Sequence, residues 1–306
     1  MLIDRLLSAN LRYYSNNHSY LDFLLLIFSS KLLRYCYFCL PDKLYLSLKY
    51  IERHGEKINF EDPKKIQEII QIHKIQNKNN QKIKELADKY RMRRYFEEIG
   101  FSKYLTKLLY SGSLTEFLME FDCEEYKSNA ICVKLSNDCG SFLPVSENLT
   151  NNQIRNHVTK CYKNKTKWIK KTREYQYNLP PVVIVEEMLH GEIFDVKMFV
   201  INHTVALIQT SSGESLGFYD VHGEKINDLK LGIDQWGNNH PTLDVSIPKS
   251  LLSKLKGDAE QIAKKLNLKF VRVDFCVAPQ NVVVTELTFS PSSGFKKYLS
   301  TNPLTI

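Results

Sequence analysis

The sequence predicts an α+β fold preceded by a helical N-terminal region. Apolar residues recur at helical spacing within residues 1–110, whereas short apolar runs separated by turns begin at about residue 115. Two late runs, 270–277 and 282–289, are joined by Ala278-Pro279-Gln280-Asn281 and predict a β-hairpin. A chain of 306 residues can form one elaborate domain or two compact ones. We therefore expect a helical region over residues 1–110 and an α+β region over residues 111–306.

The composition is that of an ordinary globular protein with a basic surplus. Hydrophobic residues make up 43% and charged residues 25%, which excludes global disorder, a collagen-like chain and a polytopic membrane protein. Lys and Arg number 42 and Asp and Glu 34, for a net charge of +8. This surplus fits nucleotide phosphates, anionic lipid, an acidic glycan or nucleic acid. We expect no nucleic-acid partner, because the acids dilute the basic residues and no nucleic-acid motif is present.

The cysteines and the most apolar segment indicate the cellular compartment that we expect for the protein. The seven cysteines show no framework spacing, which predicts a reducing, cytoplasmic compartment. Residues 21–28, LDFLLLIF, are too few to span a membrane, which takes about 20 apolar residues. Two interpretations of this segment stay open. It is a buried helix of the N-terminal region, or it is an interfacial helix that brings residues 20–40 to the inner face of the membrane.

The helical elements follow from start signals and periodicity. Asp62-Pro63 is a helix-start signal, and isoleucines at helical spacing follow over residues 66–75. Residues 85–98 return to a helical pattern that ends near Gly100. Residues 251–266 predict a long amphipathic helix. The basic segment 150–176 is interpreted as helical or irregular.

The strands follow from short β-branched runs between turns. Residues 130–135 predict a strand, and Pro180-Pro181 opens the strand-like run 182–189. Residues 194–201 and 204–209 predict a hairpin around Asn202-His203.

The last hairpin carries the clearest chemical signal. Alternation places Arg272 and Asp274 on one strand face, and it places Val284, Glu286 and Thr288 on one face of the return strand. A hairpin centred near residue 280 sets Asp274 opposite Glu286. Two adjacent carboxylates repel each other unless a cation lies between them, and oxygen ligands favour magnesium bound together with substrate phosphates. Arg272 would then hold a phosphate oxygen. The alternative is a solvated strand face with an ordinary ion pair.

Two upstream segments add cationic and acidic side chains. Lys134 stands near the end of a strand run and before the turn SNDCGS, a combination that can hold phosphates. The run VIVEEML, followed by HGEIFDVK, predicts a hinge strand whose backbone could bind an adenine edge, with an acidic residue beyond it for ribose. Lys197 shares a strand face with Asp195. Taken singly, each signal is weak, because a residue such as Lys134 is more often a surface lysine and a pair such as Glu186-Glu187 is more often solvated.

In this order the segments resemble the TupA-like branch of the ATP-grasp superfamily, which is associated with teichuronopeptide and capsular polysaccharide synthesis. The resemblance extends from about residue 40 to residue 294. It rests on LPDKLYLSLKYIERHGEKINFEDPKK at 40–65, DKYRMRRYFEEIG at 88–100, KYL at 103–105, VKLSNDCGS at 133–141, REYQY at 173–177, VIVEEML at 183–189, DVKMF at 195–199, FYD at 218–220, VRVDF at 271–275 and TELTFSPSSG at 285–294.

The resemblance implies an ATP-grasp fold over residues 111–306, in which two α+β lobes clamp ATP between antiparallel sheets. It implies ATP and Mg²⁺ as cofactors. Its implied binding residues are Lys134 for phosphates, Glu186, Glu187 and Leu189 for adenine, and Asp195 for ribose. Lys197 and Arg272 are the implied catalytic residues, facing phosphates or an acyl phosphate. Asp274 and Glu286 are the implied magnesium ligands, and Thr288 stands where many ATP-grasp enzymes have a metal-binding Asn.

The function implied by this resemblance is an ATP-dependent carboxylate–amine ligase that works through an acyl phosphate. Its partners would be an acidic glycan or lipid-linked glycan acceptor, such as a uronic acid, and an amino acid or other amine. The alternatives are a glycosyltransferase, an ATP-dependent glycan kinase and a non-catalytic membrane-peripheral module. The common metal-dependent glycosyltransferases carry Asp-x-Asp, and this chain has no such triplet.

Overall fold

The computed structural model describes residues 37–126, 130–138, 140–213, 215–227, 229–231, 247–296 and 298–299. The chain forms two compact units, residues 1–59 and residues 60–306. The described part of the first unit holds α4 (Asp42–His54), which ends at Gly55 in the left-handed region at φ 77°. Residues 21–28, on which the membrane prediction depends, lie outside the described residues. Among the described helices, none has the length and apolar character needed to cross a membrane.

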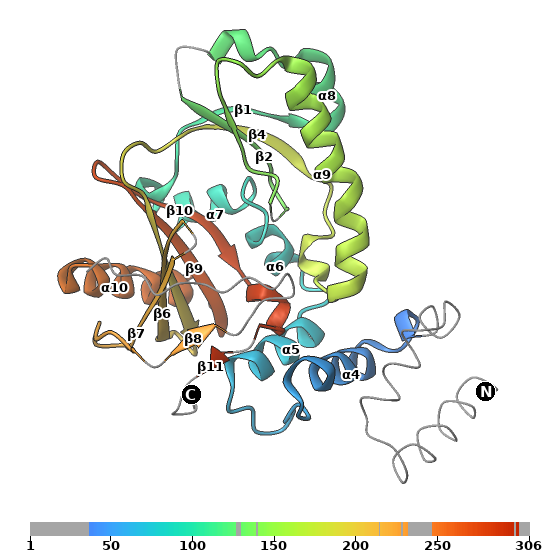
Figure 1. Ribbon diagram of the computed structural model, residues 1–306, viewed down its shortest axis with the longest axis vertical. Coiled ribbons are helices and arrows are strands. Elements are labelled where there is room, and N and C mark those ends of the chain that lie inside the picture. The colour runs from blue at the N-terminus through green and yellow to red at the C-terminus, as the bar shows by residue number, and fades with distance from the viewer. Residues whose placement is uncertain are drawn as a thin grey trace. The chain divides into compact units, whose positions relative to one another are not determined.

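The second unit begins with short helices that lead into the sheets (Figure 1). They are α5 (Ile66–Gln76), α6 (Gln81–Leu86), α7 (Met92–Glu98) and the 3₁₀ turn η1 (Ser102–Tyr104). The predicted start at Asp62-Pro63 is too early: α5 begins at Ile66, where the Glu68 carboxylate accepts backbone N–H groups from Lys64 and Lys65. A carboxylate that binds these unpaired N–H groups fixes the first turn better than the upstream proline does.

The first sheet is antiparallel, with strand order β1-β4-β2-β3. Its strands are β1 (Leu108–Ser113), β2 (Ile131–Leu135), β3 (Leu143–Val145) and β4 (Val182–Glu187). Apolar residues of β2 and β4 pack against α8 (Leu114–Glu120) and α9 (Asn151–Thr172) in one core cluster. The 3₁₀ turns η2 (Cys123–Tyr126) and η3 (Tyr175–Tyr177) lie between these elements in the chain. The basic segment predicted as helical or irregular is thus mostly the single helix α9.

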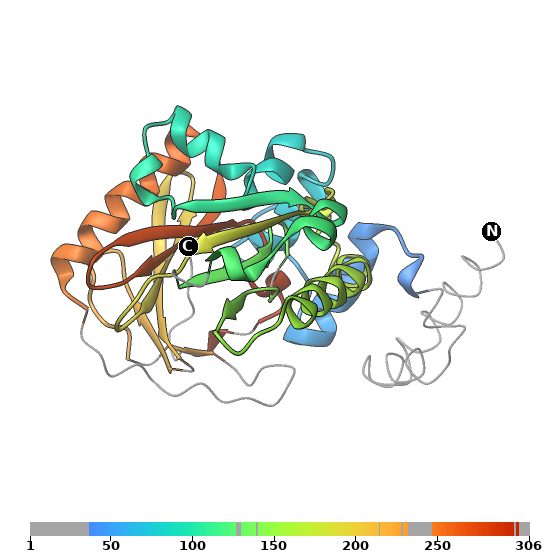
Figure 2. The same ribbon diagram turned by 90° about the horizontal axis from the view of Figure 1, so that it is seen from above.

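The second sheet is also antiparallel, with strand order β10-β9-β5-β6-β7. It consists of β5 (Phe194–Ile201), β6 (Thr204–Ser212), β7 (Ser215–Tyr219), β9 (Phe270–Val277) and β10 (Val282–Thr288). Both predicted hairpins are present. One face packs on α10 (Lys249–Lys265), α6 and α7, and α5 covers part of the other (Figures 1 and 2).

Two smaller features complete the second unit. Strands β8 (Lys230–Leu231) and β11 (Tyr298–Leu299) form a separate two-stranded sheet, and the 3₁₀ segment η4 (Pro291–Gly294) follows β10. The predicted boundary between residues 110 and 111 falls inside β1. Helices α5 to α7 therefore belong to the same compact unit as the two sheets.

Candidate active site

A row of polar side chains crosses one face of the second sheet. Glu286 of β10 lies opposite Asp274 of β9, and Asp274 lies opposite Lys197 of β5. Lys197 in turn lies opposite Gln209 of β6. The alternate residues of β9, such as Val273, point into the core on the other face. The period-2 alternation of strands thus separates a polar face from the core.

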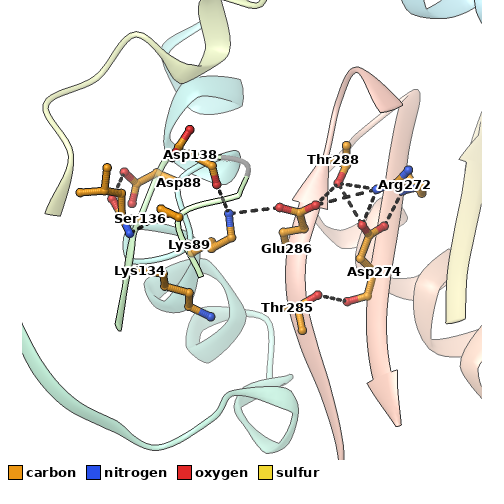
Figure 3. Close-up of polar contacts among 12 residues, drawn as sticks. Asp88, Lys89, Lys134, Ser136, Asp138, Arg272, Asp274, Thr285, Glu286 and Thr288 are labelled. Carbon is orange, nitrogen blue, oxygen red and sulfur yellow. Dashed lines mark hydrogen bonds and ion pairs between the residues drawn. The ribbon is translucent and has the colours of Figure 1, made fainter. Parts of the chain in front are cut away.

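A β-bulge in β10 brings the two carboxylates together. Val284 lies opposite Phe275 and Glu286 lies opposite Asp274, so Thr285 is an extra residue in β10. The Thr285 hydroxyl donates a hydrogen bond of 3.1 Å to the backbone oxygen of Asp274 (Figure 3). A side chain of the bulge therefore holds the two strands together where the pairing changes register.

The bulge corrects one prediction and explains another. Val284 and Leu287 both belong to the apolar core, which uninterrupted alternation would not allow. The prediction that Val284 shares a face with Glu286 and Thr288 is therefore wrong. The predicted opposition of Asp274 and Glu286 is confirmed, but only because the extra residue turns Glu286 to the polar face.

Asp274 is held by the arginine two residues earlier on its own strand. Arg272 donates from Nε to Oδ1 at 2.6 Å and from Nη2 to Oδ2 at 2.5 Å. Asp274 is 3% exposed. Burial raises the pKa of Asp274 to about 6, against the opposing effect of the guanidinium. Burial and the guanidinium of Arg272 thus act on the pKa of Asp274 in opposite directions.

Glu286 is held by a lysine from a different part of the chain. Lys89 lies in the loop between α6 and α7, and its Nζ is 3.1 Å from Glu286 Oε2. Burial by itself raises the pKa of a carboxyl group, but Lys89 and Arg272 outweigh it and lower the pKa of Glu286 to about 2. The two facing carboxyl groups thus have pKa values shifted in opposite directions, and Glu286 stays ionised at neutral pH.

Thr288 links the two carboxylates. Its Oγ1 is 3.2 Å from Asp274 Oδ2 and 3.0 Å from Glu286 Oε1, and it accepts a hydrogen bond of 3.3 Å from Arg272 Nη2. The hydroxyl has one proton to donate, so it serves one carboxylate at a time. Figure 3 shows this cluster on the two strands.

Lys89 joins the hairpin to the loop that follows β2. Its Nζ donates to the backbone oxygen of Asp138 at 2.9 Å, and its backbone N–H donates to the backbone oxygen of Ser136. The preceding residue, Asp88, is fully buried and accepts hydrogen bonds from the Ser136 hydroxyl and from Arg91. This polar contact sets the turn after β2, predicted to hold phosphates, beside the hairpin carboxylates (Figure 3).

The first sheet holds an ion cluster of its own. Lys134 Nζ is 2.5 Å from one oxygen of Glu186, and Arg93 Nη1 is 3.0 Å from the other. The Glu186 side chain is 5% exposed, so its two oxygens are committed to these two cations. Figure 3 shows Lys134 on the strand that faces the hairpin carboxylates, beside Lys89. Glu186 therefore fixes Lys134 in place, a role that the sequence did not indicate.

The remaining predicted residues surround these two clusters. Glu187 is more exposed and pairs with Lys107 at 2.7 Å. Leu189 follows β4, and its backbone groups make no hydrogen bond within the part of the chain that the structure describes. Asp195 Oδ2 is 3.3 Å from Lys197 Nζ and accepts a hydrogen bond from Ser211. Lys197 thus lies between Asp195 on its own strand and Asp274 on the next.

The segment after β10 adopts a strained conformation beside a buried polar network. Ser292, Ser293 and Gly294 have φ values of 48°, 56° and 67°, a left-handed run that is unfavourable for the two serines. Glu174 accepts hydrogen bonds from Ser290 and, at 2.7 Å, from Ser293. Lys74 donates to the Ser293 oxygen at 2.8 Å, and burial lowers its pKa to about 8. Tertiary contacts therefore hold a turn that local preference opposes.

The donor set of the hairpin fits magnesium bound with a phosphate-bearing substrate. Asp274 and Glu286 offer carboxylate oxygens from neighbouring strands, with the Thr288 hydroxyl between them. Magnesium is usually bound by one or two carboxylates plus substrate phosphates. Among the described residues no group of three or more His, Cys, Asp and Glu could hold a metal. The two carboxylates thus suit a magnesium ion that is also bound by substrate phosphates.

A match to a protein-family model identifies the family of this chain. A model of the family described as "TupA-like ATPgrasp" matches residues 68–302. The chain belongs to the TupA-like ATP-grasp family. No curated protein is significantly similar to the TupA-like chain.

Several solved ATP-grasp structures resemble this TupA-like chain at low identity. D-alanine–D-alanine ligase from Helicobacter pylori is 14% identical with a TM-score of 0.41, over 68% of this chain and 55% of that one. The enzyme of the same name from Bacillus anthracis is 13% identical with a TM-score of 0.39, over 67% and 57%. The ligase PsnB, solved with a precursor variant, Mg and ADP, is 12% identical with a TM-score of 0.40, over 72% and 58%. The alignments thus span little more than half the length of these ligases.

Sequence reasoning missed three side chains of the TupA-like site. Lys89, Asp88 and Arg93 contact the hairpin, the turn after β2 and Glu186, respectively. All three lie in the segment DKYRMRRYFEEIG that supported the resemblance. A signal was present there, but periodicity assigns the segment to a helix and does not show that its charged residues turn toward two sheets.

Proposed function

We propose that this TupA-like protein is an ATP-dependent carboxylate–amine ligase that forms an amide through an acyl phosphate. The observation that carries the proposal is the pair of opposed carboxylates, Asp274 and Glu286, joined through Lys89 to the turn after β2. A carboxylate pair beside cationic side chains can position a magnesium nucleotide, and family membership makes ATP the expected nucleotide.

The predicted binding and metal residues are proposed to hold the magnesium nucleotide together. The backbone of Leu189, which makes no hydrogen bond within the described residues, is proposed to bind the adenine edge, with Glu186 and Glu187 bordering it. Asp195 is proposed to bind the ribose. Lys134 and Lys89 are proposed to bind phosphates, with Glu186 keeping Lys134 in position. Asp274 and Glu286, with Thr288 between them, would hold magnesium, which when bound supplies charge neutralisation to the phosphates.

The proposed ligase reaction consists of two displacement steps. A carboxylate oxygen of the acceptor takes the γ-phosphoryl group of ATP, which gives an acyl phosphate and ADP. The amine nitrogen then attacks the acyl carbon, the C–N bond forms and the acyl C–O bond to phosphate breaks. The proton lost by the amine passes to the released phosphate. Lys197 and Arg272 are proposed to stabilise the charge on the transferred group. Arg272 Nη1 makes no hydrogen bond among the described residues, which leaves that N–H group for a phosphate oxygen.

We propose an acidic glycan as the acceptor, free or lipid-linked and with a uronic acid carboxylate, and an amino acid as the amine. The net charge of +8 favours an anionic acceptor. The reaction would take place in the cytoplasm, with the glycan precursor at the inner face of the membrane.

The test is nucleotide turnover with a uronic-acid oligosaccharide and a mixture of amino acids. Release of ADP and phosphate that requires both substrates, with an amide in the product mass, is expected. Release of AMP, or ATP turnover that needs neither substrate, contradicts the proposal. A phosphorylated glycan without an amide identifies a kinase, and turnover of a nucleotide sugar without ATP identifies a glycosyltransferase.

A further inference from the structure

Helix α9 carries a surface charge that the proposed active site does not use. The helix contains seven Lys and Arg residues and no Asp or Glu. Lys160, Lys163, Lys170 and Lys171 are exposed, and they recur at a spacing that keeps them on one side of the helix. At 1.5 Å per residue, they extend over about 16 Å of the helix axis.

The opposite side of α9 is occupied by the fold. Ile154 and Val158 are buried against the first sheet, and Ile169 packs in the core of the second. Lys165 of α9 is buried, and its Nζ donates to the backbone oxygen of Leu179 at 3.0 Å. Lys165 thus contacts the fold, whereas Lys160, Lys163 and Lys170 lie on the outer face.

Three lysines of this outer face have no acidic partner among the described residues. No Asp or Glu side chain there forms an ion pair with Lys160, Lys163 or Lys170. Asp122 lies at the N-terminal end of α9, where its carboxylate accepts a hydrogen bond from the Asn151 side chain. Favourable interaction with the helix dipole explains basic residues in the last turn only, so it accounts for Lys170 but not for Lys160 and Lys163.

A further exposed lysine lies near the C-terminal end of the helix. Lys78, in the turn between α5 and α6, lies over the ring of Tyr175 at 4.7 Å, and Tyr175 belongs to η3, which follows α9. Figure 1 shows α9 running alongside the first sheet. Lys78 thus adds a positive charge near the end of α9.

We propose that the outer face of α9 is a docking surface for an acidic polysaccharide, outside the proposed catalytic site. Exposed ammonium groups lie there among exposed amides, Asn156 and Asn164. Ammonium groups complement sugar carboxylates, and amides form hydrogen bonds with sugar hydroxyls. An interfacial membrane helix needs an exposed apolar face, and the apolar residues of α9 point inward.

The identity of the polymer rests on the proposed function, but the test does not require catalysis. Binding of oligogalacturonate to the full chain is measured by calorimetry at two salt concentrations, with neutral dextran as the reference polymer. The triple variant Lys160→Gln, Lys163→Gln, Lys170→Gln is expected to bind oligogalacturonate roughly tenfold to hundredfold more weakly. Binding by the wild-type protein should weaken as salt is added.

The matched control removes three exposed lysines elsewhere. Lys254→Gln, Lys264→Gln and Lys269→Gln change the net charge equally and lie on α10 and the segment after it. This control and Asp274→Asn should both bind oligogalacturonate like the wild type. Retained binding by Asp274→Asn in the absence of ligase activity separates failure of the proposed function from failure of the docking surface.

Three results would overturn the docking surface. They are the absence of oligogalacturonate binding, equal losses in the two triple variants, and stronger lysine-dependent binding to phosphatidylglycerol vesicles or to a single-stranded oligonucleotide. Vesicle binding would assign the face to a membrane, and oligonucleotide binding would assign it to nucleic acid. Thermal unfolding of both triple variants verifies that they fold.

Discussion

The two sheets each bury a carboxylate among cations, but in different ways. On the first sheet, Glu186 gives one oxygen to Lys134 and the other to Arg93, and it has no acidic neighbour opposite it. On the second sheet, a bulge turns Glu286 toward Asp274, so two acids face each other and share Arg272. The first arrangement resembles a structural ion cluster. The second sets two acids side by side, paired with Arg272 and Lys89, so that carboxylate oxygens of neighbouring strands are available together for a magnesium ion.

The largest expected effect breaks the second cluster. Asp274→Asn keeps the shape of the side chain but removes the charge, so we expect ATP turnover to fall at least about 100-fold. Turnover assayed over a range of Mg²⁺ concentrations checks this. Asp62→Asn, whose carboxylate is 68% exposed, is the control and should behave like the wild type. Full activity of Asp274→Asn would contradict the assignment of the second cluster as a metal site and of the first as a structural ion cluster.

The matching change in the first cluster should act on stability. Glu186→Gln leaves Lys134 and Arg93 close together in a buried site without an anion, so we expect the free energy of unfolding to fall by about 3 kcal/mol. Denaturant unfolding measures it. Unchanged stability together with lost ATP turnover would mean that Glu186 acts in the reaction and does not stabilise the fold.

A pH titration tests the buried network beside the segment after β10. The pKa of Lys74 is lowered by burial from 10.5 to about 8, so between these values the unfolded chain binds more protons than the folded one. Stability should therefore rise with pH in this window, by on the order of 3 kcal/mol relative to Lys74→Met. The free energy of unfolding of both proteins at pH 7.5 and 10.5 gives the difference. Parallel behaviour of the two proteins would show that Lys74 titrates normally.

The smallest expected effect concerns the bulge. Thr285→Val keeps the shape of the side chain but removes the hydrogen bond to the Asp274 backbone, so we expect a loss of stability of about 1 kcal/mol. The apparent affinity for Mg²⁺ should fall as well, because Glu286 is positioned by the same bulge. The exposed Thr115→Val is the control, and an equal loss there would assign no special role to Thr285.

Much of the fold could be predicted from local pattern. The two hairpins, the amphipathic helix α10 and the alternation that separates Asp274 from Val273 follow from the period of apolar residues, which the sequence displays directly. The motifs placed Asp274, Glu286, Lys134 and Lys197 as candidate site residues, and these assignments stay predictions. The ATP-grasp family, suggested by ordered motifs, is confirmed by the family match.

Only the tertiary structure decided which charges meet. The contacts of Lys89 with Glu286, of Arg93 with Glu186 and of Glu174 with Ser293 join segments about 90 residues or more apart in sequence, and no local periodicity encodes such contacts. The bulge at Thr285 is likewise a property of the paired strands, since a lone strand has no register to shift. The sequence therefore determined which elements form and which residue types they carry. Packing between the elements decided which side chains pair, because burial of a charge is tolerated only where a distant opposite charge is brought to it.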